Sequence, residues 1–416
     1  MPENPVIASE NPVGNWRDDP VHRAWLGQDA RRQLDFFRAS LRKYGGFDVL
    51  EWDGAPRAGV QQELHVTTRL IHSYALGAAF GYGDTAAIID AGMACLWTGH
   101  RDAMHGGYCW SIDGKTAVDA SKLAYGHVFV LLAGASAKQS GHPDADRLID
   151  DVTAVIDRHF WDDDRGLLRE EFHGDWTRFS TYRGMNANMH GVEAMLAAFE
   201  ATGRETYLRR AGRILDFFVG KIASTHQWRI PEHYTEEWQL DRNYAGNPMF
   251  RPMGTTPGHS LELGRLLIQH SDLSRRPQDQ SLVQARSLIE RALADAWLPD
   301  GGLCYTLDYS GHIAIRDRYW WPVAEAIGAI SALQQIDPRE EDEVWYRKLW
   351  RFAHDHLVDH RFGGWYPELD EGGKPVQKQF LGKPDIYHSL QADLLPLVGS
   401  PSRLISALKL NGGNQS

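Results

Sequence analysis

Cysteine is scarce in this sequence of 416 residues. The three cysteines, Cys95, Cys109 and Cys304, are an odd number and lack the spacing of a metal site. A disulfide framework needs an even set of cysteines and an oxidising compartment. We therefore expect a cytoplasmic protein without structural disulfides.

Segments that direct a chain to a membrane are also missing. Residues 1–5 contain neither a basic nor an apolar segment, so no signal peptide is predicted. No apolar run approaches the roughly 20 residues that a membrane span requires. The sequence thus predicts no association with a membrane.

Basic clusters and cofactor motifs are likewise missing. The formal net charge is -11 and the lysines and arginines are dispersed, which argues against a nucleic-acid partner. No glycine-rich nucleotide-binding motif occurs. His354, His356 and His360 are close in sequence but lack zincin spacing and fall on an expected outer helix. We expect no cofactor and no metal.

Tryptophan, by contrast, is abundant. The chain has 15 tryptophans, and Trp320 and Trp321 are adjacent. Such residues fill hydrophobic cores, and their flat rings also pack against the C–H faces of sugars. Both interpretations stay open at this point.

Glycine turns divide the chain into similar helical units. A helical pattern runs from Val21 to Tyr44, and a second has Leu64, Ile71 and Ala78 on one face. Between helices of this kind, a glycine turn carrying an aromatic residue or leucine recurs about every 60 residues. The turns are Gly45-Gly46-Phe47, Gly106-Gly107-Tyr108, Arg165-Gly166-Leu167, Gly301-Gly302-Leu303 and Gly363-Gly364-Trp365.

One gap between these turns is about twice as long as the others. Residues 227–234 take the place of a sixth turn there without its glycines, and the long loop 239–256 accounts for the extra length. Six helical hairpins that close on themselves form an all-α (α/α)6 barrel, whereas an open solenoid is the alternative. We favour the closed barrel, because six is the number of hairpins that completes the ring and because both ends of the chain resemble tails.

The predicted organisation is one domain, residues 1–416, with loose tails at about 1–16 and 400–416. In an (α/α)6 barrel one helix of each hairpin lines the inside. These inner helices should follow the turns, and polar residues at their starts should converge in one pocket. Their predicted starts lie near Gln61, Asp119, Gly184, Gly258, Trp320 and Asp385.

Residues 253–265 form the most informative stretch. A Thr-Thr-Pro-Gly turn precedes a helix start, which places His259 in the first turn. The exposed N–H groups of that turn carry positive potential, which disfavours a protonated imidazole. A proton-abstracting base must be neutral, so the position suits such a base. Glu262, three residues on, shares the face of His259 and could bind a hydroxyl or fix the imidazole tautomer. A histidine that caps a buried helix is the alternative.

Other polar residues also lie at or near the predicted starts of inner helices. Asn186 and His190 are four residues apart on one predicted helix face, where asparagine could instead serve as a cap. Asp385 is a plausible N-cap that puts His388 in a first turn, repeating the His259 arrangement. Arg251 ends a loop that leads toward the predicted pocket, or it is an ordinary surface arginine.

Five motifs together resemble the N-acylglucosamine 2-epimerase superfamily, in order and spacing, from about Trp25 to Pro396. Within that family the resemblance is greatest to the bacterial aldose–ketose isomerases, the mannose and sulfoquinovose isomerase group. The motifs are Asn186-Ala187-Asn188-Met189-His190, Thr256-Pro257-Gly258-His259 with Glu262, Trp321-Pro322 with Glu325-Ala326, Asp385-Ile386-Tyr387-His388, and Val118-Asp119-Ala120-Ser121-Lys122.

The resemblance implies an (α/α)6 barrel and roles for individual residues. His259 and His388 match the two acid/base histidines, and His190 and Asn186 match residues near the reacting carbons. The positions that match substrate-binding residues are Arg69, Tyr125, Arg251, Glu262 and Trp321. Pro367 and Pro384 depart from the glutamines of sulfoquinovose enzymes, which favours a neutral hexose.

These roles imply interconversion of D-mannose and D-fructose through a cis-enediol. We expect His259, oriented by Glu262, to move the carbon-bound proton and His388 to assist ring opening, although the two roles could be exchanged. The expected partner is a monosaccharide, and the chain is a monomer or homodimer. The alternatives are a sugar 2-epimerase, a sulfoquinovose isomerase, a glycosidase with two carboxylates, and a non-catalytic binding protein.

Overall fold

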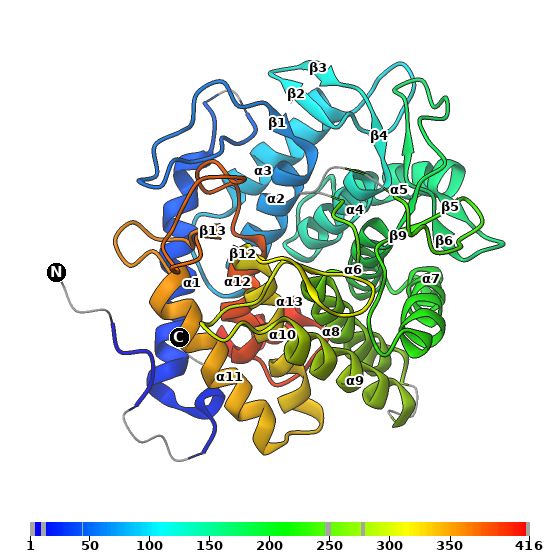
Figure 1. Ribbon diagram of the computed structural model, residues 1–416. Helices are drawn as coiled ribbons and strands as arrows, with labels where there is room; N and C mark the ends of the chain where they lie inside the picture. Colours follow the sequence, from blue (N-terminus) through cyan, green and yellow to red (C-terminus); the bar gives the residue numbers. More distant parts are fainter. Residues whose placement is uncertain are drawn as a thin grey trace. The chain divides into compact units, whose positions relative to one another are not determined.

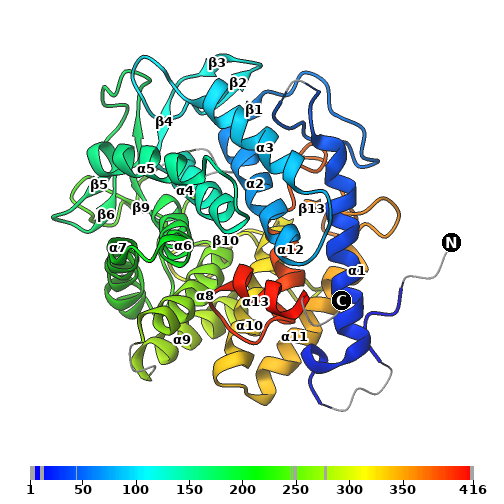
Figure 2. The same cartoon turned by 180° about the vertical axis from the view of Figure 1, so that it is seen from behind.

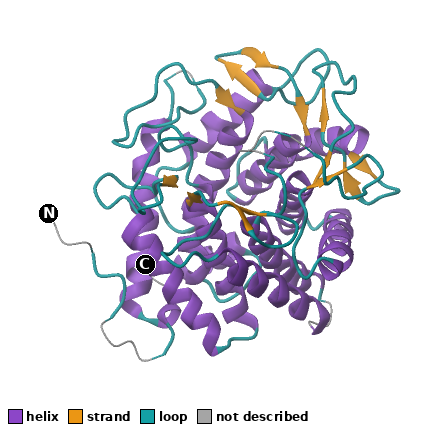
Figure 3. Ribbon diagram, viewed as in Figure 1, coloured by secondary structure: helices purple, strands orange, loops and turns teal. Residues whose placement is uncertain are grey.

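The computed structural model describes residues 5–9, 14–43, 45–244, 246, 251–275 and 279–412. Helices dominate it, and the strands are short (Figure 3). Residues 247–250 of the predicted loop, and the outermost parts of both predicted tails, lie outside the described residues.

The α-helices belong to successive hairpins (Figure 1). They are α1 (Pro20–Phe37), α2 (Leu64–Ala79), α3 (Ala86–Cys95), α4 (Ala124–Gln139), α5 (Ala145–Val155), α6 (Met185–Thr202), α7 (Glu205–Leu215), α8 (Pro257–Ser274), α9 (Asp279–Ala296), α10 (Trp320–Ile336), α11 (Glu340–Phe352), α12 (Tyr387–Leu394) and α13 (Leu404–Gly412). Four outer helices continue into π-helical segments, η3 (Leu96–His100), η4 (Ile156–Phe160), η5 (Asp216–Ala223) and η6 (Ala353–Leu357). Three 3-10 segments are η1 (Trp16–Asp18), η2 (Arg38–Ser40) and η7 (Leu395–Leu397).

The strands pair antiparallel in small ladders. They are β1 (Gln62–Glu63), β2 (Ser111–Asp113), β3 (Thr116–Asp119), β4 (Lys122–Leu123), β5 (Trp161–Asp162), β6 (Leu167–Leu168), β7 (Glu171–Phe172), β8 (Arg183–Gly184), β9 (His233–Tyr234), β10 (Thr306–Leu307), β11 (Ile313–Ile315), β12 (Arg318–Tyr319) and β13 (Glu368–Leu369). The strand before an inner helix pairs with the next hairpin, as β4 with β7, β8 with β9 and β12 with β13. This pairing links neighbouring hairpins just where each inner helix starts.

The chain folds into two compact units, each built from several separate segments of the sequence. Unit 1 comprises residues 1–39, 49–56 and 256–416, and therefore contains α1 and α8 to α13. Unit 2 comprises residues 40–48 and 57–255, and contains α2 to α7. The single-domain organisation stays a prediction.

The five glycine turns have the predicted repeated geometry. In the second turn, Gly107 has φ +69°, and an added Cβ would lie 2.9 Å from Nε2 of His127. That nitrogen instead accepts the N–H of Tyr108 at 3.0 Å, so the inner helix holds the turn. Likewise, the side-chain oxygens of Gln62, in β1, and Asn188, in α6, accept the N–H groups of Phe47 and Leu168.

The sixth turn, predicted without glycine, is also present. Gln227 and Trp228 have φ +56° and +63°, the left-handed conformation that glycine supplies elsewhere. A backbone bridge between Pro231 and Thr255 then leads the chain toward α8.

Inner helices begin within a few residues of the predicted starts, at Leu64, Ala124, Met185, Pro257, Trp320 and Tyr387. They are buried on nearly all sides, unlike the amphipathic outer helices. The first and last hairpins meet within unit 1, where α1 packs against α12 and Leu50 forms a backbone bridge with Lys383. This contact is the one that an open solenoid lacks.

Three sequence predictions are corrected. The helix predicted to Tyr44 ends at Phe37, with Arg38–Ser40 as a 3-10 turn. The predicted tail 400–416 contains α13, which is visible in Figure 2. This helix forms because Ile405 and Leu408 lie on one face and are buried. The tail predicted to residue 16 is attached, since Ser9 donates to Asp19 and Trp16 is buried.

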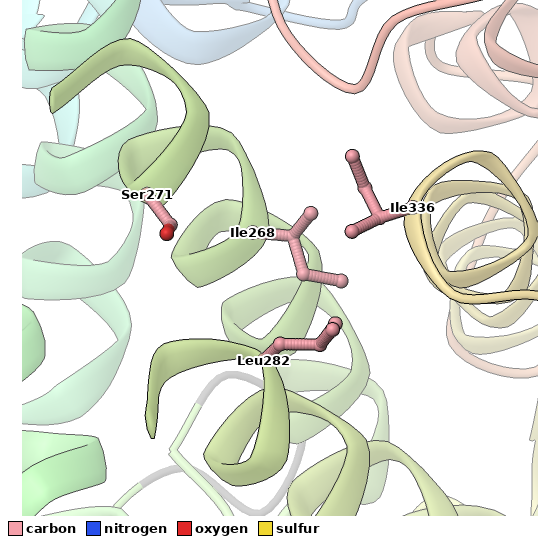
Figure 4. Close-up of a pocket in the computed structure, with 4 residues that line it drawn as sticks. All are labelled: Ile268, Ser271, Leu282 and Ile336. Carbon is pink, nitrogen blue, oxygen red and sulfur yellow. The ribbon is translucent and has the colours of Figure 1, made fainter. Parts of the chain in front are cut away.

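The small pocket in Figure 4 lies among three helices of unit 1. Ile268 and Ser271 of α8, Leu282 of α9 and Ile336 of α10 line it. Its volume of about 10 Å³ is at the lower limit for one water molecule, so it is a packing defect. Among the described helices, none combines the length and apolarity needed to cross a bilayer.

Candidate functional site

Helices α8, α10 and α12 bring four predicted site residues together in unit 1. Gly258, in the first turn of α8, makes this approach possible, since a Cβ there would lie 2.4 Å from the ring of Trp321. His259 is the third residue of α8 and His388 the second of α12, as predicted. Both histidines therefore belong to first helical turns.

A buried chain of polar contacts connects the three helices. Nδ1 of His388 lies 2.7 Å from Oε1 of Glu325, and Nη2 of Arg265 donates to Oε2 of Glu325 at 3.1 Å. All three residues are buried, with exposed fractions of 5% for His388, 2% for Glu325 and 4% for Arg265. A histidine with one nitrogen hydrogen-bonded to a carboxylate has a fixed tautomer and orientation.

The indole of Trp321 contacts both histidines. Its centroid lies 5.1 Å from that of His259 and 5.8 Å from that of His388, at interplanar angles of 31° and 37°. Glu262 is fully buried. One of its carboxylate oxygens lies within 4.8 Å of a carboxylate oxygen of Glu325 and of a ring nitrogen of His388. The predicted orientation of His259 by Glu262 stays a prediction.

Unit 2 assembles a second group. Nη2 of Arg69, on α2, donates to the hydroxyl of Tyr125, on α4, at 2.9 Å. The Tyr125 ring meets the His190 ring of α6 edge to face at 5.3 Å, and Nδ1 of His190 lies 3.6 Å from Glu193. Three inner helices thus bring Arg69, Tyr125 and His190 together, as a shared pocket requires.

Arg251 lies in a different environment of unit 2. Its guanidinium pairs with Glu171 at 2.7 Å and stacks on the Tyr182 ring at 4.1 Å. Desolvation lowers the pKa of Arg251, but its hydrogen bond to Glu171 and the nearby negative charges together outweigh desolvation and raise this pKa, so the group stays charged. Burial raises the pKa of the neighbouring Glu170 to about 7.

A polar cleft of about 420 Å³ adjoins this ion pair. It is lined by Arg158, His159, Arg169, Glu170, Glu171, Phe172, Arg178, Ser180, Arg183 and Glu236. Asn186 lies half-buried in the first turn of α6. Its neighbour Asn188 instead binds the backbone of Leu168 and Gly184, and is therefore structural.

Glu262, Glu325 and His388 have the composition of a metal site, with one ligand atom of each within 4.8 Å of the others. However, both oxygens of Glu325 are already used, by His388 and Arg265. The arrangement therefore fits a hydrogen-bonded acid–base network better than a metal centre. His354, His356 and His360 hydrogen-bond to backbone carbonyls of Pro5, Gly373 and His354, which gives them structural roles.

The sequence profile of one family, described as N-acylglucosamine 2-epimerase (GlcNAc 2-epimerase), matches residues 45–392. The chain belongs to the N-acylglucosamine 2-epimerase family. A D-mannose isomerase of Thermobifida fusca is 40% identical over 404 residues, which cover 95% of this chain and 99% of that one. A D-mannose isomerase of Pseudomonas cannabina pv. alisalensis is 37% identical over 407 residues, 95% of this chain and 97% of that one.

Solved structures of similar fold agree with this membership. A crystal structure of a D-mannose isomerase has a TM-score of 0.85 and 32% identity, covering 90% of this chain and 97% of that chain. A cellobiose 2-epimerase from Spirochaeta thermophila has a TM-score of 0.80 at 22% identity, over 92% of this chain and 96% of that one, which concerns the fold alone. The predicted all-α (α/α)6 barrel is confirmed, and this member of the N-acylglucosamine 2-epimerase family is an isomerase.

Sequence reasoning missed the role of Arg265 and the partnership of Glu325 with His388. Arg265 follows His259 and Glu262 at steps of three on α8, and Glu325 follows Trp321 by four on α10. These spacings place the charged residues on the same helix faces as the predicted site residues. A search for charges at those steps would have found both residues, but not the contacts between them.

Proposed function

We propose that this isomerase interconverts D-mannose and D-fructose by acid–base catalysis with His388 and His259. The D-mannose isomerases that resemble it at 37% and 40% identity over nearly their whole length support the substrate. The observation that carries the mechanism is the 2.7 Å contact between Nδ1 of His388 and Oε1 of Glu325.

Isomerisation needs a base that works twice on one face of the sugar. The pyranose ring must open, a proton must leave C2, and a proton must reach C1 of the resulting cis-enediol. With the Nδ1 proton donated to Glu325, a neutral His388 carries its lone pair on Nε2. That nitrogen would take the C2 proton and return it to C1, while the Glu325 carboxylate stabilises the intermediate imidazolium.

The Glu325 contact favours His388 for this step over His259, to which the sequence pattern assigned it. His259, half-buried in the first turn of α8, would then assist ring opening and move hydroxyl protons. Trp321, in contact with both imidazoles, would pack on the sugar between them.

The remaining predicted residues would bind and polarise the substrate. Arg69 and Arg251 are the cations that would hold hydroxyls and stabilise negative charge on the enediolate. Tyr125, Asn186 and Glu262 would fix sugar hydroxyls, and His190 would donate a hydrogen bond near the reacting carbons. No step in this scheme requires a metal or a redox cofactor.

The direct test is incubation of the purified protein with D-mannose and identification of the product. We expect D-fructose, and the same equilibrium mixture from either sugar. Glucose as the main product would instead indicate C2 epimerisation, and the absence of any conversion would indicate a different substrate or a binding protein. A higher kcat/KM for sulfoquinovose than for mannose would contradict the neutral substrate inferred from Pro367 and Pro384. Monosaccharide released from a disaccharide would indicate a glycosidase.

A further inference from the structure

We propose that Arg265 is a positioning residue, which acts through Glu325 to orient His388 and to set the pH range in which this imidazole is a base. The inference rests on the proposed function for its catalytic consequences, but not for its effect on the imidazole itself. Arg265 touches no reacting atom in this scheme. Its influence would pass through the Glu325 carboxylate alone.

The first support is the division of the two oxygens of Glu325. Oε1 faces Nδ1 of His388 at 2.7 Å, and Oε2 accepts from Nη2 of Arg265 at 3.1 Å. A carboxylate fixed at one oxygen by a guanidinium cannot rotate freely, so the other oxygen keeps its direction. Because all three groups are buried, water screens their charges little.

The second support is a glycine that makes room for the arginine. Gly328 lies one turn after Glu325 on α10, and a Cβ there would be 3.2 Å from Cδ of Arg265 and 3.0 Å from Cδ1 of Leu395. Arg265, from α8, thus reaches Glu325 across a gap in the side chains of α10. Gly328 therefore leaves room for both the Arg265 stem and Leu395.

The charges around His388 predict the direction of the effect. The negative Glu325 favours the imidazolium, and the positive Arg265 opposes it by compensating that charge. Removal of Arg265 should therefore raise the proton affinity of the Glu325–His388 pair, whereas removal of the Glu325 charge should lower it. In the described part of the chain, the titratable or charged groups near His388 include Glu325 of α10, Glu262 of α8 and Tyr387 of its own helix, and Arg265 of α8 lies behind Glu325.

The test is steady-state kinetics against pH for Arg265→Met, which retains an apolar stem without the charge. We expect kcat to fall about 10- to 100-fold, as for residues that orient a catalytic group, with little change in KM. The acid limb of kcat/KM should move to higher pH, whereas Glu325→Gln should move it to lower pH. Arg265→Lys should recover part of kcat and part of the shift.

Arg286→Met is the matched control. Arg286 is also a buried arginine of unit 1, and it pairs with the buried Asp342 at 2.8 Å, away from the histidines. Its loss should lower the melting temperature and leave the acid limb in place. An acid limb that moves equally in both variants would overturn the proposal, because the shift would then reflect general loosening of the fold.

NMR titration of the His388 ring protons in the sugar-free protein separates this inference from the proposed function. A higher pKa of His388 in Arg265→Met supports the proposal even if the protein makes no fructose from mannose. An unchanged pKa and an unchanged acid limb overturn it even if wild-type isomerisation is confirmed. Should Arg265→Met fail to fold, Arg265→Gln, which keeps a polar side chain without the charge, must show the same upward shift, and its absence overturns the proposal.

Discussion

Both oxygens of the Glu325 carboxylate already face a hydrogen-bond partner, so a metal ion would have to compete for them. His388 uses one of its oxygens and Arg265 the other, and both neighbours are buried. An imidazole bound in this way can exchange protons through its second nitrogen, which is what a reversible isomerisation demands. At the residue scale the site is therefore suited to proton transfer rather than to Lewis-acid catalysis.

The corresponding prediction concerns metal removal. Dialysis against EDTA should leave kcat/KM for mannose unchanged, because metal binding by Glu262, Glu325 and His388 would compete with the Arg265 contact. The measurement is activity after chelation, with metal content checked in the same sample. Loss of activity that Mn²⁺, Co²⁺ or Zn²⁺ restores would show that the trio holds a metal.

At the scale of the elements, the start of α8 determines the distance between His259 and Trp321. Gly258→Ala should lower kcat/KM at least tenfold, because the new methyl would overlap the Trp321 ring at 2.4 Å. Overpacking of this kind costs about 1–3 kcal/mol of stability, so thermal melting should accompany the kinetics.

Gly220→Ala is the control, since a Cβ at Gly220 meets nothing within 4 Å. It should retain wild-type kcat/KM. If Gly258→Ala is as active as Gly220→Ala, the close approach of α8 to Trp321 does not contribute to activity.

Elements were also the level at which the sequence was most informative. Glycine turns and helix starts follow from local chemistry, so five turns and the first-turn places of His259 and His388 were predictable. The Glu325–His388 contact was not, because it joins residues 63 positions apart and depends on how two helices pack. The helix α13 was missed because it has only 9 residues and follows a proline-containing turn.

At the scale of the whole molecule, buried acids join the first helix to the last hairpin. Nε2 of Gln33, on α1, donates to Asp393 of α12 at 2.6 Å and to Asp29 at 3.2 Å. Burial, and then the neighbouring Asp29, raise the pKa of Asp393 well above its usual range. Asp393 therefore holds a proton more tightly in the folded protein than in the unfolded chain.

The prediction is a loss of stability on the alkaline side. The pKa of Asp393 is higher in the folded protein than in the unfolded chain, where it is about 4. Its contribution to the free energy of unfolding is therefore complete below the unfolded pKa and is lost as the pH rises through the folded pKa. Asp393→Asn should thus show a smaller fall in melting temperature between pH 5 and pH 9 than the wild type. Asp146→Asn, at the exposed pair with Lys138, should fall as the wild type does. Equal falls in the wild type and Asp393→Asn would contradict this assignment.

The central claim is that His388 moves a proton between C2 and C1, and isomerisation of D-mannose in D₂O tests it most directly. For the wild type we predict fructose whose C1 carries partly the proton moved from C2 and partly deuterium that His388 has exchanged with the solvent. His388→Ala should lose about 10²–10⁴-fold in rate and exchange no C2 hydrogen, whereas His259→Ala should retain trace exchange from the open-chain sugar. Near-wild-type conversion and exchange in His388→Ala with an unchanged circular dichroism spectrum would contradict the mechanism.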